Sequence, residues 1–118
     1  MSHPWKDLLV WQKAHSFVID IYKAVSHFPD TEKFCLSQQI RRSAVSIAAN
    51  IVEGKSKKTD KEFTSFLFNS RDSLEETRYH LLLARDLGFI NNEKYEDLEN
   101  QSIEISYLLN RLIESVSK

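Results

Sequence analysis

The sequence contains little of what interrupts helices or cross-links a fold. Its 118 residues include only two Gly, two Pro and one Cys. So few turn-forming residues argue against many short strands and favour a few long helices. The single cysteine, Cys35, excludes an intramolecular disulfide and any metal site built from several cysteines.

Long apolar runs and a strong net charge are lacking as well. No stretch of about 18 apolar residues occurs, and the first residues do not form a signal-peptide pattern, so we expect a cytoplasmic protein without a membrane segment. The formal net charge is −1, which by itself gives no evidence for a nucleic-acid partner. Apolar residues make up 42% and charged residues 28%, which is typical of a single folded domain over residues 1–118.

Apolar residues recur every three or four positions in four segments. The segments are separated by Pro29, which follows Phe28, and by Gly54 and Gly88. This spacing predicts helices over about 7–27, 33–54, 60–87 and 92–116. Because the connections are short, we predict an all-α, up-down-up-down antiparallel four-helix bundle.

Local signals mark the ends of these helices. Gly54 and Gly88 stand where a left-handed residue is expected just after a helix. Thr59, three residues before Glu62, predicts a capping box for the third helix, and Asn91 or the next residue is expected to cap the fourth.

The apolar stripes predict the core in three of the segments. In the first segment the expected line is Trp11, Ala14, Val18, Ile21 and Val25, flanked by Val10, Phe17 and Ala24. In the third it is Phe63, Leu67, Ser70, Leu74, Thr77, Leu81 and Ala84. In the fourth it is Tyr95, Leu98, Ser102, Ile105, Leu109, Leu112 and Val116.

The second segment is apolar over most of its circumference. One stripe consists of Leu36, Ile40, Ala44, Ile47 and Ile51, and beside it lies a second stripe of Val45, Ala48, Ala49 and Val52. A helix of this kind must be covered on more than one side. Three partner helices in a monomer, or a neighbouring subunit, would provide that cover. The breadth of the pattern favours self-association, with the second stripe as candidate oligomer interface.

A narrow polar line remains on this predicted helix. Its members, which fall within about 80° at 100° per residue, are Gln39, Arg42, Ser46, Asn50 and Glu53. Such a line between apolar flanks is expected to set the register of helix packing, and ligand binding is the alternative.

Basic residues concentrate between residues 33 and 61. In an antiparallel bundle the turn at residues 55–61 lies at the same end as both termini, and the opposite end collects acidic residues. The candidate nucleic-acid-binding residues are Arg41, Arg42, Lys55, Lys57, Lys58 and Lys61. Such a basic end can neutralise nucleic-acid phosphates whatever the base sequence. The simpler interpretation is that the lysines only keep an exposed turn soluble. In a ring of parallel subunits the positive potentials would add.

Catalytic signals are few. No glycine-rich phosphate loop occurs. The nearest approach to a di-iron motif is the single pair Glu76 and His80, which is more often part of a solvated face. Cys35 has no identifiable base, so a small packing residue is the better interpretation. We therefore expect a protein that is not an enzyme and that holds no metal or cofactor.

Three stretches carry a resemblance to a known family. They are DLLVWQKA at residues 7–14, QIRRSAVSIAANIVEG at 39–54 and LGFI at 87–90. Together they resemble the 23S rRNA intervening-sequence protein family, also called the S23 ribosomal protein family. The resemblance implies bacterial four-helix bundles that assemble as homopentamers and have no known catalytic activity. It also implies a signature that includes Arg41, Arg42, Asn50, Glu53 and Gly54, within a matched stretch that also contains Gln39 and Ser46.

A related branch of that family is the accessory protein of diversity-generating retroelements. The resemblance to it implies a basic barrel that binds nucleic acid and a reverse transcriptase. We therefore expect a pentameric bundle that binds RNA or DNA through its basic end, with a nucleic-acid-processing protein as a further expected partner. The rival hypothesis is a protein–protein assembly module without nucleic acid. A small-molecule or metal-binding bundle is the weakest reading, because no converging ligand set is visible.

Overall fold

Four α-helices make up most of the chain in the computed structural model, which describes residues 3–118. A short 3-10 helix precedes the first α-helix, and a second one precedes the second. No strand occurs within these residues. The elements in chain order are η1 Pro4–Asp7, α1 Leu9–Val25, η2 Asp30–Glu32, α2 Leu36–Lys55, α3 Asp60–Asp86 and α4 Asn92–Val116.

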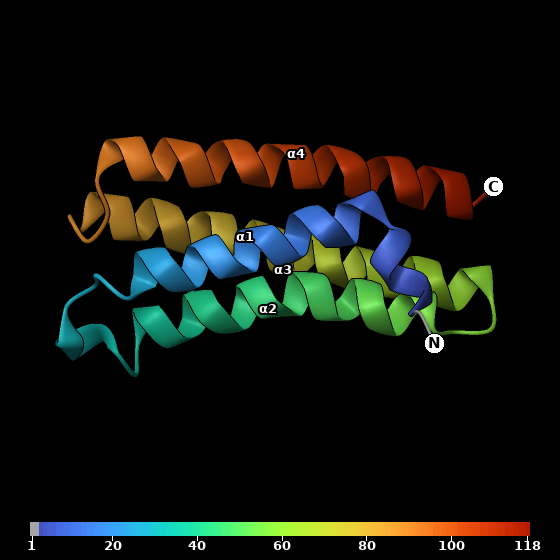
Figure 1. Cartoon of the computed structure of the whole chain (residues 1–118), viewed down its shortest axis with the longest axis horizontal. Coiled ribbons are helices and arrows are strands. Elements are labelled where there is room, and N and C mark those ends of the chain that lie inside the picture. Colours follow the sequence, from blue (N-terminus) through green and yellow to red (C-terminus); the bar gives the residue numbers. More distant parts are fainter. Residues whose placement is uncertain (1–2) are drawn as a thin grey trace.

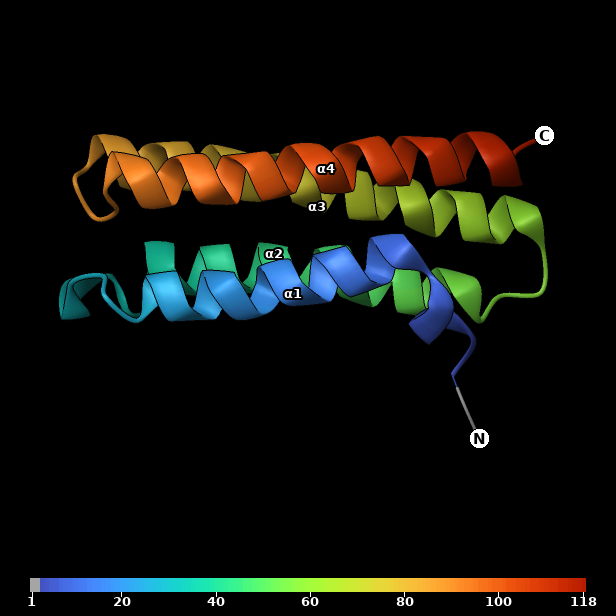
Figure 2. The ribbon, with the colours of Figure 1, turned by 45° about the horizontal axis from the view of Figure 1, so that its top comes forward.

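The helices lie side by side along one long axis, in a body of 43 × 25 × 21 Å (Figure 1). α1 packs against α2 and α4, and α3 packs against the same two helices. In Figure 2, α1 and α2 form one layer, and α3 and α4 form the other. The turn between α2 and α3 lies at the same end as η1 and the C-terminus. The α1–α2 and α3–α4 connections lie at the far end.

The predicted caps of α3 and α4 are present. Thr59 Oγ1 accepts a hydrogen bond from the backbone N–H of Glu62 at 3.1 Å and donates one to Glu62 Oε1 at 2.9 Å. Asn91 Oδ1 accepts from the N–H of Lys94 at 2.7 Å. Each cap satisfies backbone donors that the helix itself leaves without a partner.

The helix bounds differ from the predicted ones mainly in the first half of the chain. α1 begins at Leu9 instead of residue 7, because Pro4–Asp7 forms a separate 3-10 turn, and it ends at Val25, before Pro29. α2 begins at Leu36 instead of residue 33, because Asp30–Glu32 forms another 3-10 turn. α3 and α4 match their predicted bounds to within one residue.

The buried residues confirm the predicted stripes of α2 and α3 in full, and they correct the predicted stripes of α1 and α4. Every predicted member in α3 is buried, and so is the main stripe of α2. In α1 the buried line runs through Val10 and Phe17, while Trp11 and Val18 are only half-buried. In the last turns of α4, Ile113 is buried in place of Leu112, and Val116 is only half-buried. Two adjacent apolar lines compete in these helices, and the helices packed against them decide which line is buried.

Gly54 corrects another prediction. It is not a left-handed residue after α2 but a buried position inside that helix. Among residues 3–118 only Gly88 has a positive φ, at 80°. A Cβ built on Gly54 would lie 2.8 Å from the Cβ of Phe66 and 2.9 Å from a ring carbon of Phe63. Glycine is therefore required at residue 54 because α2 and α3 approach closely there.

Candidate nucleic-acid interface and oligomer face

The lysine turn, which we define as Lys55, Lys57, Lys58 and Lys61, joins α2 to α3. All four side chains are exposed. Within residues 3–118 none of them forms an ion pair. The turn therefore presents four ammonium groups to solvent at one end of the bundle, which is the arrangement that phosphate contacts require.

Aromatic rings of α3 hold two of these lysines. Lys55 Nζ lies 5.5 Å from the ring centroid of Phe63, and Lys57 Nζ lies 5.0 Å from that of Phe66. Because a cation over an aromatic face is attracted to it, these contacts limit where the two ammonium groups move. Thus Gly54 brings α2 close to the two phenylalanines, and the phenylalanines in turn position the lysines.

Acidic residues partly offset the charge of the lysine turn in one chain. Glu53 precedes it, and Asp60 and Glu62 lie in the first turn of α3, all three exposed. Asp60 and Glu62 are favourably placed for the α3 dipole. A strong positive field at this end therefore requires more than one copy of the turn.

The structure does not bring Arg41 and Arg42 to the lysine turn. They lie in the second turn of α2, so about 20 Å of helix separates Arg42 from Lys55 at 1.5 Å per residue. Arg41 Nη2 donates to the backbone oxygen of Lys33 at 3.5 Å, and its guanidinium lies 6.0 Å from the ring centroid of Tyr22. The six candidate residues thus divide into two separate groups.

The predicted polar line of α2 divides as well. Ser46 and Asn50 face α3: the Oγ atoms of Ser46 and Ser73 are 2.8 Å apart, and Asn50 Nδ2 donates to Ser46 Oγ at 3.0 Å. Gln39, Arg42 and Glu53 are instead exposed. Arg42 and Glu53 form no ion pair with each other in the part of the chain described.

Hydroxyl groups line the contact between α2 and α3. We call this set the hydroxyl seam: Ser43, Ser46, Ser70, Ser73 and Thr77. Thr77 Oγ1 donates to Ser43 Oγ at 2.7 Å, and Ser70 Oγ donates to the backbone oxygen of Ile47 at 2.7 Å. Small side chains allow the helices to approach closely, and the hydrogen bonds fix their register. Ser70 and Thr77 within the predicted apolar stripe were the sequence signal for this seam, but their partners were not predicted.

An apolar surface extends along the outside of α1 and α2. Val45 is 40% exposed, and Tyr22, which lines the same surface pocket, is 49% exposed. Ile19, about one turn before Tyr22 on α1, is 43% exposed. The other three candidate interface residues, Ala48, Ala49 and Val52, are half-buried. We call the surface formed by these six residues the α1–α2 face. One copy of the chain leaves its apolar side chains partly in water.

The first helical turns add aromatic rings on the outside of the bundle. Trp5 and Trp11 pack with ring centroids 4.7 Å apart, and the ring of His15 stacks on Trp11 at 5.0 Å. This packing fixes η1 against α1. It also explains why Trp11, predicted to lie in the core, is only half-buried.

The residues considered as catalytic or metal-binding candidates do not lie together in one site. Cys35 is exposed, which contradicts its interpretation as a packing residue, because it lies in the connection just before α2. Within residues 3–118 no group of three His, Cys, Asp or Glu side chains is arranged to hold a metal ion. The Nδ1 atom of His80 is buried and has no hydrogen-bond partner in the described part of the chain, and Glu76 is exposed.

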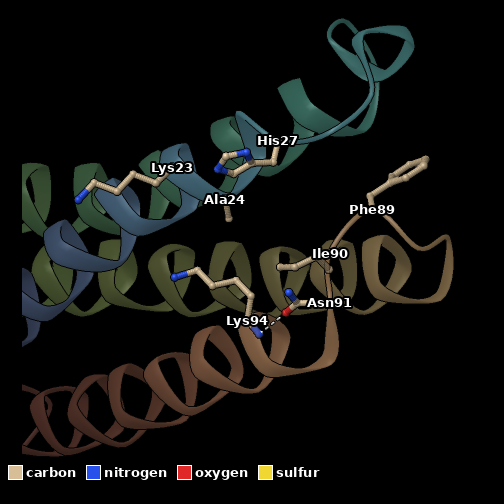
Figure 3. Close-up of a pocket in the computed structure, with 7 residues that line it drawn as sticks. All are labelled: Lys23, Ala24, His27, Phe89, Ile90, Asn91 and Lys94. Atoms are coloured by element: carbon tan, nitrogen blue, oxygen red, sulfur yellow. Dashed lines mark hydrogen bonds between the residues drawn. The ribbon is translucent and has the colours of Figure 1, made fainter.

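A pocket of about 380 Å³ lies at the far end, between the last turns of α1 and the α3–α4 connection (Figure 3). Lys23, His27 and Lys94 contribute polar groups to it, and Ala24 and Ile90 contribute apolar surface. Lys94 Nζ forms an ion pair with Asp97 at 3.2 Å. That pairing makes the pocket a poorer phosphate site than the lysine turn, because one of its cations is already neutralised.

One ion pair joins α3 to α4, and a second lies within α3. Arg78 contacts Glu99 at 2.7 Å and Glu75 at 2.9 Å. The hydrogen bond with Glu99 raises the pKa of the Arg78 guanidinium above its ordinary value. The Arg78–Glu99 pair holds the two helices together, and Arg78 Nε is buried without a hydrogen-bond partner within residues 3–118. None of the helices in residues 3–118 has the length and apolar character needed to cross a bilayer.

The architecture is that of an all-helical protein in which four helices pack together, and comparison with known proteins places it more closely. Residues 6–111 match the family described as 23S rRNA-intervening sequence protein. A crystal structure of a protein of unknown function from the S23 ribosomal protein family, from Bacteroides thetaiotaomicron, is 33% identical in sequence. It matches with a TM-score of 0.80 over 89% of this chain and 98% of that one. The comparison with curated proteins finds no match.

This chain belongs to the 23S rRNA-intervening sequence protein family, as the resemblance in residues 7–14, 39–54 and 87–90 predicted.

Proposed function

We propose that this protein is a non-enzymatic bundle of up-down-up-down topology that assembles as a homopentamer and binds nucleic-acid phosphates through the lysine turn. The observation that carries the proposal is the set of four exposed ammonium groups at one end of the bundle, without carboxylate partners within residues 3–118. Contacts of this kind are independent of sequence and depend steeply on salt.

Assembly is part of the proposal because one copy is nearly neutral. The α1–α2 face supports it, since Val45, Ile19 and Tyr22 leave apolar surface in water that a second copy would cover. A closed ring of parallel copies would place all the lysine turns on one rim, where their potentials add. A nucleic-acid-processing protein is a further proposed partner of that rim.

The rival function is an assembly module that binds only protein. The contacts of Lys55 and Lys57 with phenylalanine rings favour it, because those lysines already have a structural role. The acidic residues beside the turn favour it too, because they weaken the attraction for phosphate.

Binding of a single-stranded oligonucleotide, measured over a series of salt concentrations, distinguishes the two proposed functions. We expect the dissociation constant to rise steeply with salt, and the triple variant Lys55→Glu, Lys57→Glu, Lys58→Glu to reduce the slope of log K against log salt by about 2 to 3. A variant with the same charge change at the far end, Lys23→Glu, Lys33→Glu, Lys94→Glu, is the matched control and should keep the slope. Equal slopes in both variants, or no binding by the unaltered protein at low salt, would favour the rival.

A further inference from the structure

A second pocket, of about 470 Å³, lies beside the lysine turn, between the start of α3 and the end of α4. It is of the size that small-ligand pockets have. Its apolar surface comes from Phe68 and Val116, and three hydroxyl groups and two lysines also line it. The residues that the argument uses are Lys61, Thr64, Ser65, Phe68, Val116 and Ser117.

Phe68 gives this pocket an exposed aromatic ring. The residue is 39% exposed, although it lies on a helix whose other apolar stripe is fully buried. The Arg71 guanidinium lies over the ring, 4.7 Å from its centroid, and Arg71 Nη1 donates to Asn110 Oδ1 at 3.0 Å. Because Arg71 covers one face of the ring and is itself tied to α4, the ring is held in place.

The pocket also contains a hydroxyl group without a partner. The Oγ1 atom of Thr64 is buried from solvent and makes no hydrogen bond within residues 3–118. A buried polar atom of this kind costs free energy, and rotation of the Thr64 side chain toward the pocket would let a ligand or water satisfy it. The hydroxyls of Ser65 and Ser117 line the same pocket, and each hydroxyl both donates and accepts.

We infer that this pocket takes an unpaired base of a single-stranded nucleic acid, an inference that rests on the proposed function. A base has a planar face that stacks on an aromatic ring and a polar edge that hydroxyl groups bind. Because hydroxyl groups both donate and accept, every base is accommodated.

Shape and apolar surface, and not charge, favour a base over a phosphate in the pocket. Its side chains carry both signs of charge, because Asp60 lines it together with Lys61 and Lys118. Phe68 and Val116 supply the surface that a base would cover. The phosphates on either side of the base lie instead toward Lys61 and the rest of the lysine turn. The pocket is formed by α3 and α4, so the α1–α2 face remains available for a second copy.

The test compares three labelled ligands in fluorescence anisotropy titrations of the full chain: a single-stranded 12-mer, a duplex of the same length and an abasic strand with the same phosphates. We expect the single strand to bind tightest. Phe68→Ala should weaken its binding about fivefold or more and leave the abasic strand within about twofold. Phe68→Leu, which keeps apolar bulk, should lose as much. Tyr79→Ala, at an exposed aromatic elsewhere on α3, is the matched control and should change neither.

Two results would overturn this inference and leave the proposed function intact. One is equal binding of the single strand and the abasic strand by the unaltered protein. The other is an equal loss for both ligands in Phe68→Ala. Failure of all three ligands to bind would contradict the proposed function as well.

Thr64→Val is a second variant, and it tests the pocket without changing the aromatic ring of Phe68. It removes the unpartnered hydroxyl and keeps the side-chain shape, so the melting temperature should stay the same or rise. Binding of the single strand should fall, whereas binding of the abasic strand should not. A fall in melting temperature without any change in binding would show that Thr64 has only a structural role, and it would count against the pocket.

Discussion

Gly54 and Phe66 are packed so closely that a Cβ on residue 54 would lie 2.8 Å from the Cβ of Phe66. Gly54→Ala should therefore force α2 and α3 apart. Overpacking costs about 1 to 3 kcal/mol, and the better helix propensity of alanine offsets at most about 1 kcal/mol, so we expect a net loss of about 1 to 2 kcal/mol. Urea unfolding followed by circular dichroism measures it. Gln39→Ala, at an exposed position of the same helix, should change stability little.

Gly88 is needed for a different reason. Its φ of 80° is in the left-handed region, and a Cβ there would meet nothing within 4 Å. Gly88→Ala should cost about 1 kcal/mol through backbone strain alone, and Gly88→Asn should cost less, because Asn tolerates that region better. Thermal unfolding of both variants checks the order. Equal losses would show that the backbone changes conformation when the glycine is replaced.

The hydroxyl seam predicts coupling between Ser43 and Thr77. Thr77→Val removes a hydroxyl group whose one hydrogen is within hydrogen-bond distance of both Ser43 Oγ, at 2.7 Å, and the backbone oxygen of Ser73, at 2.8 Å. We expect a loss of about 1 kcal/mol, and a smaller additional loss when Ser43→Ala is added than Ser43→Ala causes alone. A double-mutant cycle in urea measures the coupling. Strict additivity would mean that the seam does not act as a unit.

A charged side chain placed on the α1–α2 face should prevent the protein from assembling. Val45 is already 40% exposed, so Val45→Glu should leave the fold of one chain intact and prevent a second copy from packing on it. Light scattering at micromolar concentration should show a smaller particle, with unchanged helical content. Ile103→Glu is the matched control on α4, where Ile103 is 51% exposed, and it should not change the mass. A mass of 13.8 kDa for the unaltered protein would contradict assembly.

Arg41 and Arg42 should contribute little to binding at the lysine turn. They lie about 20 Å along α2 from Lys55. Replacing both by alanine should leave the salt slope for the single strand within experimental error. A slope reduced by about 2 would place them on the same bound strand and would enlarge the interface beyond one end of the bundle.

Structural features that depend on one helix alone were predicted from the sequence better than features that depend on contacts between helices. The stripe of α3 was predicted in full, because its other apolar residues, such as Phe66 and Phe68, do not form a second continuous line along the helix. In α1 the line through Trp11 and Val18 was as apolar as the line through Val10 and Phe17, so periodicity could not decide between them. The close approach at Gly54 was missed because it depends on Phe66, which lies on another helix.

The candidate site shows the same limit. The basic residues were identified from their concentration between residues 33 and 61, and the rise of α2 alone separates Arg42 from Lys55 by about 20 Å. The aromatic pocket was not predicted at all. Phe68 lines a pocket because the start of α3 and the end of α4 leave space beside its ring. That space depends on how the two helix ends are placed relative to each other, which the apolar pattern of neither helix shows.

The exposed position of Cys35 has a practical consequence. It is the chain's one thiol, and it lies at the start of α2, about 30 Å of helix away from Lys55. A maleimide dye would therefore attach at a single defined point, remote from the surface where an oligonucleotide is expected to bind. Energy transfer from that dye to a labelled strand would then report which end of the bundle the strand occupies.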